Sequence, residues 1–263
     1  MVSSRKRRPA AGASGIGAYD VVADSHIGLI RDCNEDSYVY WAEESHPSTL
    51  VAVADGIGGH ECGDVASAMC MRKILTDWRR QRVFDITAKA RLSAFLSDSI
   101  REANDAIFSI NREYNIQHPM GTTIVAGVFT TDHLLVAHAG DSRCYRLRNG
   151  VIKRLTQDHS FVAELIRKNI ISPAEARNHP FAHIISKSVG PTPTVELEIN
   201  IFEHHPRDRY VFCSDGLCAH VEDPEIETVL YDATNPYEAV KNLLYASLRG
   251  GGEDNITVLC VFA

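Results

Sequence analysis

The pattern of apolar and polar positions along the chain predicts many short strands interrupted by a few helices. Apolar or alternating runs of strand length, rich in Val, Ile, Tyr and Phe, predict the strands. They cover residues 19–25, 38–41, 50–54, 124–129, 134–139, 143–148, 151–152, 195–201, 210–214 and 256–262. Apolar residues spaced three and four apart predict amphipathic helices at 66–74 and 92–110, and further helices are predicted at 161–168, 224–231 and 237–249.

Four of the predicted strands, between residues 124 and 152, follow one another with short connections. The pair Asn149-Gly150 between the last two is typical of a tight hairpin turn. We therefore predict an antiparallel meander in this part of the chain.

Residues 160–190 interrupt the strand pattern with a polar, proline-containing segment. We predict a flap over the surface, where loops usually carry specificity. His179 and His183 are four residues apart, which on a helix would suit a metal ion. Pro180 lies between them and argues against a helix, so a structural role is favoured for both.

Composition narrows the class of protein. The chain has 263 residues, 44% of them hydrophobic, which is enough to bury a substantial core. A formal charge of -7 argues against nucleic-acid binding, because a polyanion requires a concentrated basic face. Seven cysteines without a Cys-x-x-Cys pair indicate buried free thiols in a reducing compartment. No apolar run approaches the ~20 residues that a membrane span needs.

The first 18 residues differ in composition from the rest. They contain Arg5-Lys6-Arg7-Arg8 followed by Ala, Gly and Ser, without the leucine-rich core of a secretory signal. We expect residues 1–18 to be a disordered basic tail and residues 19–263 to form the folded domain. An electrostatic docking arm or a targeting peptide is the alternative for the tail.

The candidate chemistry lies at the ends of strands. The continuously apolar run 50–54, typical of a strand covered on both faces, leads directly into Asp55 and Gly56. Asp215-Gly216 repeats this arrangement after strand 210–214. Asp141 and Asp254 also lie beside small or glycine residues near strand ends, and Asp36 directly precedes a strand. For a single Asp-Gly pair, a helix cap is the simpler interpretation, but the repetition favours a shared site.

Carboxylates that lie close together repel one another and raise each other's pKa unless cations neutralise them. Oxygen ligands without a Cys or His set suit Mg²⁺ or Mn²⁺ better than Zn²⁺. Two such ions can activate a water molecule for displacement at phosphorus. No cysteine is followed by an arginine six positions later, as a cysteine phosphatase would require, and there is no Gly-x-Ser-x-Gly motif. Arg31 is the preferred ligand for a phosphoryl group, and Arg143 is the second candidate, although a structural ion pair is favoured for it.

These motifs together resemble the PP2C (PPM) family of metal-dependent protein serine/threonine phosphatases. The matching stretches occur in the order typical of the family. They are Arg31 to Asp36, Asp55 to Ser67, Gly121 to Thr123, Ala139 to Arg143, Leu155 to Ser160, Ser214 to Leu217 and Gly252 to Thr257.

The resemblance implies an α+β fold, a four-layer α-β-β-α sandwich of two antiparallel sheets flanked by helices, with a dinuclear metal site at one end. It implies that Asp55 bridges two Mn²⁺ or Mg²⁺ ions and that the Gly56 carbonyl group binds one of them. It assigns Asp215 and Asp254 to the other ion, Asp36 to a role directly or through water, and Asp141 to a third, weaker ion.

The resemblance also assigns the substrate phosphate to Arg31. Many eukaryotic members have His directly after the Asp-Gly pair, proposed as the general acid, where this chain has Ile57. His60 or a metal-bound water are the alternatives for that role. The compact length and the flap resemble bacterial stand-alone members, which imply a cytoplasmic monomer, a phosphoprotein substrate and an opposing Ser/Thr kinase.

The sequence leaves three functions open. The first is an active phosphoprotein phosphatase, which is favoured by Arg31 and by the four aspartates that match metal ligands of the family, Asp55, Asp141, Asp215 and Asp254. The second is a catalytically weak pseudophosphatase that acts as a binding scaffold, and the third is a hydrolase of small phosphate esters that uses the same site.

Overall fold

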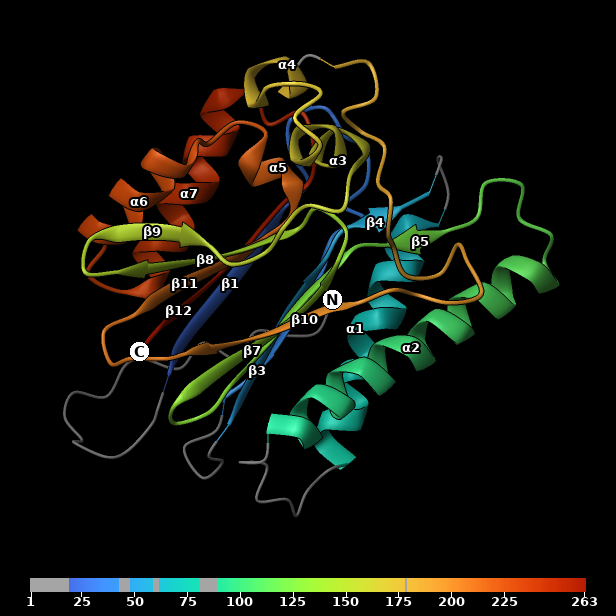
Figure 1. Cartoon of the computed structure of the whole chain (residues 1–263), viewed down its shortest axis with the longest axis horizontal. Coiled ribbons are helices and arrows are strands. Elements are labelled where there is room, and N and C mark those ends of the chain that lie inside the picture. The colour runs from blue at the N-terminus through green and yellow to red at the C-terminus, as the bar shows by residue number, and fades with distance from the viewer. Residues whose placement is uncertain (1–18, 43–47, 59–61, 81–88, 178) are drawn as a thin grey trace.

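Two five-stranded antiparallel sheets lie face to face at the centre of the structure, with helices on the outer face of each (Figure 1). The structure is a computed structural model and describes residues 19–42, 48–58, 62–80, 89–177 and 179–263. The predicted tail 1–18 and the candidate general acid His60 lie outside the described residues. The arrangement is the predicted four-layer α-β-β-α sandwich.

The first sheet has the strand order β1-β12-β11-β8-β9. Its strands are β1 (Asp20–His26), β8 (Arg143–Arg148), β9 (Val151–Arg154), β11 (Arg209–Cys213) and β12 (Ile256–Phe262). Its outer face is covered by α5 (Asp215–Cys218), α6 (Asp223–Asp232) and α7 (Pro236–Gly250). The sequence sets the start of α7, since the Asn235 side chain accepts a hydrogen bond from the Glu238 backbone N–H and Pro236 occupies the first turn.

The second sheet has the order β10-β7-β6-β3-β2. Its strands are β2 (Ser37–Trp41), β3 (Thr49–Ala54), β6 (Ile124–Phe129), β7 (His133–Ala139) and β10 (Glu198–Glu203). The long helices α1 (Gly63–Arg80) and α2 (Lys89–Glu113) cover its outer face. A two-residue pair, β4 (Gly56–Ile57) with β5 (Gly121–Thr122), lies beside it.

The position of strand β3 between two covered faces explains why its sequence is continuously apolar. Leu50, Ala52 and Ala54 pack toward α1 and α2, whereas Val51 and Val53 pack between the two sheets. All six residues of the strand are buried, because side chains alternate between two covered faces. The predicted strand covered on both faces is therefore confirmed.

The predicted meander between residues 124 and 152 is wrong in one respect. Strands β6 and β7 pair in the second sheet, whereas β8 and β9 pair in the first. The chain crosses from one sheet to the other at residues 140–142, where Gly140 has a φ of +113° that favours glycine. Alternation along a strand cannot distinguish these arrangements, because it specifies which residues are buried but not the partner strand.

The strand predicted at 195–201 begins later, at Glu198. Its partner β7 pairs Glu198 with His138, and β7 ends one residue beyond, at Ala139. Gly140 then turns the partner strand away, so Val195 and Leu197 pack on the core without joining the ladder.

Residues 160–190 carry the short helices α3 (Phe161–Arg167) and α4 (Pro173–Arg177). The Ser160 hydroxyl group accepts a hydrogen bond from the Ala163 backbone N–H and caps α3. The rings of His179, Phe161 and Phe181 contact one another. His179 is not on a helix, which agrees with the structural role that the sequence favours. None of the described helices combines the length and apolar character needed to cross a membrane.

Candidate metal centre

Five aspartates at or near strand ends lie close enough to interact electrostatically with one another. Asp215 begins α5 and Asp55 directly precedes β4, and both elements lie at one end of the sandwich (Figure 1). Antiparallel register explains part of this convergence. Ser37 pairs with Ala54, so Asp36 and Asp55 leave adjacent strands at the same edge. Cys213 pairs with Arg143, which likewise brings the chain segments of Asp215 and Asp141 together. We call the set the aspartate cluster; its members are Asp36, Asp55, Asp141, Asp215 and Asp254.

Asp36 is buried and held by two hydroxyl groups. Ser214 Oγ and Thr257 Oγ1 each donate a hydrogen bond of 2.7 Å to Asp36 Oδ2. Burial raises the pKa of Asp36 to about 7, and the charges of Asp215 and Asp254 act in the same direction, against the two hydrogen bonds. Asp36 Oδ1 is buried and has no hydrogen-bond partner among the described residues.

Asp55 and Asp215 form the centre of the cluster. Each carboxyl group lies close enough to the other for the two to titrate together. Burial, together with neighbouring carboxylates, raises the pKa of both groups above the ordinary value. Without cations the protein can keep these carboxyl groups together only by protonating some of them.

Asp141 lies on the crossover between the two sheets. Burial raises its pKa to about 8, and the negative charges of Asp215 and Asp158 add to the effect. Its Oδ1 atom, like the Oδ1 atom of Asp215, is buried without a hydrogen-bond partner in the described part of the chain. Unpartnered carboxylate oxygens are costly inside a protein, so each one marks a position where a cation would be stabilising.

The donor set fits divalent ions that prefer oxygen. Its buried oxygens are hard ligands, and its excess negative charge requires cations. The residue beside Asp55 must be glycine for a steric reason, because a Cβ atom on Gly56 would lie 2.3 Å from the Gly63 carbonyl oxygen. Only glycine lets the Asp55–Gly56 backbone pass so close to the start of α1.

Arg31 lies at the outer edge of the cluster. Its Nη2 atom donates a hydrogen bond of 2.7 Å to Asp254 Oδ2, and 51% of its side chain is exposed. The other Asp254 oxygen, Oδ1, accepts from the Asn255 backbone N–H at 2.8 Å. The guanidinium group therefore lies between the aspartates and solvent, where an incoming anion would arrive.

Arg143, the second candidate for binding phosphate, is used structurally. Its Nε and Nη2 atoms donate to Asp158 at 3.0 and 2.7 Å, and Nη1 donates to the Tyr145 hydroxyl group at 3.0 Å. This two-point pairing is the geometry that arginine favours with a carboxylate. The predicted ion pair is confirmed, with Asp158 and not the adjacent Asp141 as the partner.

Sequence comparison shows that residues 25–249 match the pattern of the family described as Protein phosphatase 2C. The chain belongs to the protein phosphatase 2C family. One relative is the serine/threonine phosphatase stp of Listeria monocytogenes, 37% identical over 235 residues that cover 89% of this chain and 92% of that protein. Another is the serine/threonine protein phosphatase PstP of Mycobacterium tuberculosis, 36% identical over 90% of this chain and 43% of that longer protein.

Solved structures of protein phosphatase 2C relatives share the fold. A serine/threonine phosphatase of S. agalactiae has a TM-score of 0.86 at 31% identity, covering 93% of this chain and 99% of that one. The catalytic domain of PstP, solved in complex with two manganese ions, has a TM-score of 0.78 at 34% identity, covering 93% and 98% of the two chains. The family is one of protein phosphatases, so the chain is an enzyme of that class.

Sequence reasoning did not single out the polar residues that hold the cluster of this protein phosphatase 2C member in place. Thr123 Oγ1 accepts from the Asp55 backbone N–H at 3.0 Å, beside the two hydroxyl groups that hold Asp36. The Asn255 side chain accepts from the Glu35 backbone N–H at 2.8 Å and donates to the carbonyl oxygens of Ile27 and Cys33. It thereby anchors the loop that carries Arg31. Their position inside the matched motif stretches was the only indication in the sequence of a role for Ser214, Thr123 and Asn255.

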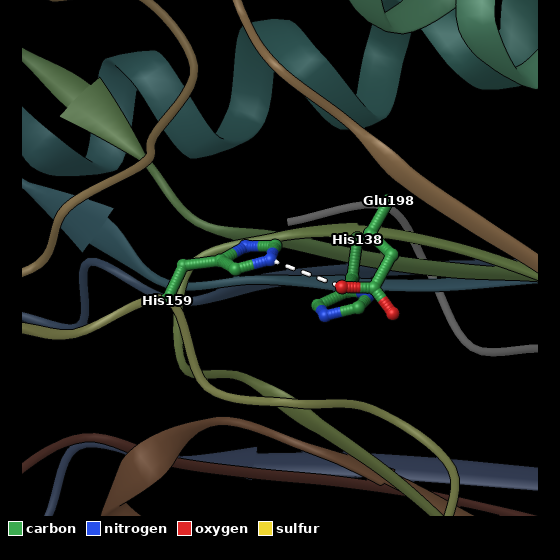
Figure 2. A group of neighbouring side chains, drawn as sticks. All are labelled: His138, His159 and Glu198. Atoms are coloured by element: carbon green, nitrogen blue, oxygen red, sulfur yellow. Dashed lines mark hydrogen bonds and ion pairs between the residues drawn. The ribbon is translucent and has the colours of Figure 1, made fainter. Parts of the chain in front are cut away.

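His138, His159 and Glu198 form a second group of possible metal ligands (Figure 2). The ligand atoms of the three residues lie within 4.8 Å of one another. The two rings are stacked nearly parallel, however, with centroids 4.6 Å apart and an interplanar angle of 3°. An imidazole binds a metal ion in its own ring plane, and two stacked parallel planes share no such point.

The two histidines instead connect the segment around Gly140 with the segment 157–159 through hydrogen bonds. His138 Nε2 lies 2.9 Å from the Gln157 carbonyl oxygen, and the Gly140 backbone N–H donates to His159 Nδ1 at 3.3 Å. The proton of neutral His159 therefore resides on Nε2, which faces Glu198 Oε2 at 3.4 Å. Burial, with the neighbouring His138, lowers the pKa of His159 to about 4. We interpret the pair as an uncharged clamp on the crossover that carries Asp141.

Proposed function

We propose that this protein phosphatase 2C member hydrolyses phosphoserine and phosphothreonine in proteins at a site for two Mn²⁺ or Mg²⁺ ions. The observation that supports this most is the aspartate cluster, in which three buried carboxylate oxygens have no hydrogen-bond partner among the described residues. The PstP domain that binds two manganese ions has the same fold.

Each ligand role follows from the motif stretches and stays a prediction for this chain. Asp55 would bridge the two ions, and the Gly56 carbonyl group would bind one of them. Asp215 and Asp254 would bind the other, Asp36 would act directly or through water, and Asp141 would hold a third, weaker ion. When bound, the ions would neutralise the carboxylates and supply an activated water for displacement at phosphorus.

The chain's own side chains would orient this site. Ser214 and Thr257 hold Asp36 Oδ2 in place, and Oδ1 has no hydrogen-bond partner among the described residues and would be available to an ion or its water. Arg31 would bind the phosphate, because its guanidinium group is half exposed and its contact with Asp254 uses only Nη2. The general acid is unassigned: Ile57 cannot donate a proton, and His60 stays a prediction outside the described residues.

The test compares hydrolysis of a phosphothreonine peptide with hydrolysis of a small aryl phosphate, each with Mn²⁺, Mg²⁺ or chelator. We expect peptide turnover that needs a metal ion and is lost with chelator. Arg31→Ala should raise KM for the peptide, with Arg112→Ala as a matched control on the distant helix α2. Turnover in chelator equal to that in Mn²⁺ would contradict the two-metal site.

The same experiment separates the alternatives. If the folded protein shows no turnover with either metal, it is a pseudophosphatase scaffold. If the peptide is no better a substrate than the small ester, the protein is a hydrolase of small phosphate esters. The opposing Ser/Thr kinase, the cytoplasmic setting and the monomeric state belong to this proposal, and a pull-down with kinase-phosphorylated proteins and light scattering would test the first and last.

A further inference from the structure

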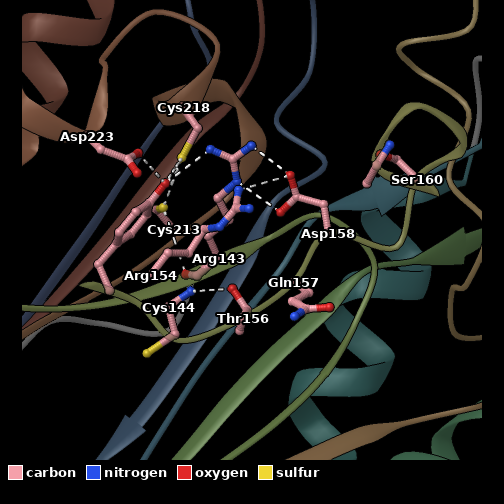
Figure 3. Close-up of polar contacts among 12 residues, drawn as sticks. Arg143, Cys144, Arg154, Thr156, Gln157, Asp158, Ser160, Cys213, Cys218 and Asp223 are labelled. Atoms are coloured by element: carbon pink, nitrogen blue, oxygen red, sulfur yellow. Dashed lines mark hydrogen bonds and ion pairs between the residues drawn. The ribbon is translucent and has the colours of Figure 1, made fainter. Parts of the chain in front are cut away.

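Two cysteine thiols lie on either side of Asp215. Cys213 ends β11, and Cys218 ends the short helix α5, so the pair encloses residues 214–217 (Figure 3). Their Sγ atoms are 3.6 Å apart. The disulfide S–S bond is about 2.05 Å long, so the sulfur atoms need to approach by about 1.5 Å to form one. A side-chain rotation with a small backbone shift covers that distance.

The surroundings of Cys218 favour the thiolate form, which is the nucleophile in thiol oxidation. The Tyr145 hydroxyl group lies 3.6 Å from Cys218 Sγ, and it accepts a hydrogen bond from Arg143 Nη1. The hydrogen bond from Cys213, with the positive charge of Arg143, lowers the pKa of Cys218 to about 7 although burial opposes it. Cys213 is buried, whereas the residue Cys218 is only partly buried, so Cys218 is the member of the pair nearer to solvent.

We propose that Cys213 and Cys218 form a reversible disulfide with a hydroperoxide and that this bond switches off the metal site around Asp215. The Cys218 thiolate attacks one peroxide oxygen, the O–O bond breaks, and Cys218 becomes a sulfenic acid as hydroxide leaves and takes up a proton. The Cys213 thiol then attacks that sulfur, and the sulfenic oxygen leaves as water with the thiol proton. Two thiols and one hydrogen peroxide give one disulfide and two water molecules.

The segment between the two cysteines has little freedom to absorb this change. Ser214 donates to Asp36 and accepts from the Thr257 backbone N–H at 2.9 Å. The Gly216 carbonyl oxygen accepts from Ser247 Oγ at 2.8 Å, and a Cβ atom on Gly216 would lie 2.1 Å from the Asn255 carbonyl oxygen. Drawing Cys218 toward Cys213 therefore displaces Asp215 or the Ser214 hydroxyl group, and both belong to the metal site.

The disulfide is tested directly by mass spectrometry. Trypsin releases the peptide 210–241, which contains Cys213 and Cys218 as its only cysteines. After the folded protein is treated with hydrogen peroxide and its remaining thiols are blocked, we expect this peptide to lack two hydrogens and to carry no blocking group. Dithiothreitol should restore both thiols. If both thiols of the peptide are blocked while the exposed Cys33 is oxidised, the proposal is overturned.

The regulatory part rests on the proposed phosphatase function and has its own readouts. Peroxide should lower phosphopeptide turnover and Mn²⁺ affinity of the wild type about tenfold, as expected when a supporting group around a metal ligand is displaced. Cys218→Ser and Cys213→Ala should resist peroxide, with circular dichroism confirming their fold, whereas Cys33→Ser should stay as sensitive as the wild type. Equal sensitivity of Cys218→Ser, or a disulfide that changes neither turnover nor Mn²⁺ affinity, would overturn the switch.

The two proposals fail in different ways. A protein without phosphatase activity in its reduced state contradicts the proposed function, while the mass of peptide 210–241 still decides whether the disulfide forms. Mn²⁺ affinity before and after oxidation then decides whether the disulfide acts on the site.

Discussion

Two aspartates flank strand β11 and have opposite environments. Asp208 precedes the strand and is 1% exposed, and Asp215 follows it. Asp208 accepts hydrogen bonds from Arg148 at 2.8 and 2.6 Å, from the Tyr210 hydroxyl group at 2.9 Å and from the His205 backbone N–H at 2.9 Å. Asp215 faces other carboxylates, and its Oδ1 atom has no partner among the described residues.

The pKa values follow this difference. Burial alone would raise the pKa of Asp208, but its hydrogen bonds from Arg148, His205 and Tyr210 lower it below the ordinary value. Burial and the charge of Asp254 raise the pKa of Asp215. A buried carboxylate whose cation is supplied by the chain stabilises the fold, whereas one without a cation indicates a site for an external cation.

The largest difference between the two aspartates is expected in phosphopeptide turnover. Asp215→Asn should lower phosphopeptide turnover by about 100-fold or more, because a predicted metal ligand loses its charge and supporting groups alone are worth 10–100-fold. Asp208→Asn should leave turnover within about twofold, since it lies at the opposite end of β11. Steady-state kinetics with Mn²⁺ measures the turnover of both variants. Similar losses of turnover in the two variants would contradict the assignment of a metal-binding role to Asp215 and a structural role to Asp208.

The second largest difference between the two aspartates is expected in the free energy of unfolding of their Asn variants. Asp208→Asn should lower the free energy of unfolding by about 1–3 kcal/mol, because Arg148 loses its charged partner. Asp215→Asn should stabilise the metal-free protein or leave it unchanged, since it removes repulsion within the cluster. Urea unfolding in chelator measures both variants, and a metal-free Asp215→Asn protein less stable than the Asp208→Asn protein would contradict the comparison.

A smaller effect is expected in the pH dependence of metal stabilisation. The pKa values of Asp36 and Asp141 are about 7 and about 8 in the folded chain, against about 3.9 for aspartate in an unfolded chain. Between these values the folded state binds more protons, so without metal these groups make the protein less stable as pH rises. The rise in Tm caused by Mn²⁺ should therefore be larger at pH 8 than at pH 5.5.

The difference in that rise should be several degrees, since 1 kcal/mol corresponds to about 2–4 °C for a chain of this size. Thermal scans with saturating Mn²⁺ or chelator at the two pH values provide the test. A rise that is independent of pH would show that the cluster does not release protons when it binds metal.

The smallest effect concerns the histidine clamp. His159 has a pKa of about 4 in the folded chain, below the ordinary 6.5, so the unfolded state binds more protons between these values. Stability is therefore lost as pH falls from about 6.5 toward about 4. His159→Gln should remove on the order of 1 kcal/mol of this loss between pH 7 and 5. Urea midpoints of both proteins at the two pH values measure it, and identical pH slopes would contradict the neutral clamp.

Much of the site was predictable because its signals are local. Asp55 follows a continuously apolar strand, and Asp215 repeats the pattern after β11, so each position could be read from about ten neighbouring residues. The partners of Asp36 could not, because Ser214 and Thr257 are 178 and 221 residues away in sequence. The crossover at Gly140 was missed for the same reason, since sheet membership depends on distant strands.

The central claim is that the aspartate cluster binds two divalent ions, and calorimetric titration of the folded protein with Mn²⁺ tests it most directly. We predict two tightly bound ions per chain for the wild type and for Asp208→Asn, apart from a weaker third ion, and loss of at least one tight ion for Asp215→Asn. Failure of the folded wild type to bind Mn²⁺, or unchanged binding by Asp215→Asn, would contradict the account.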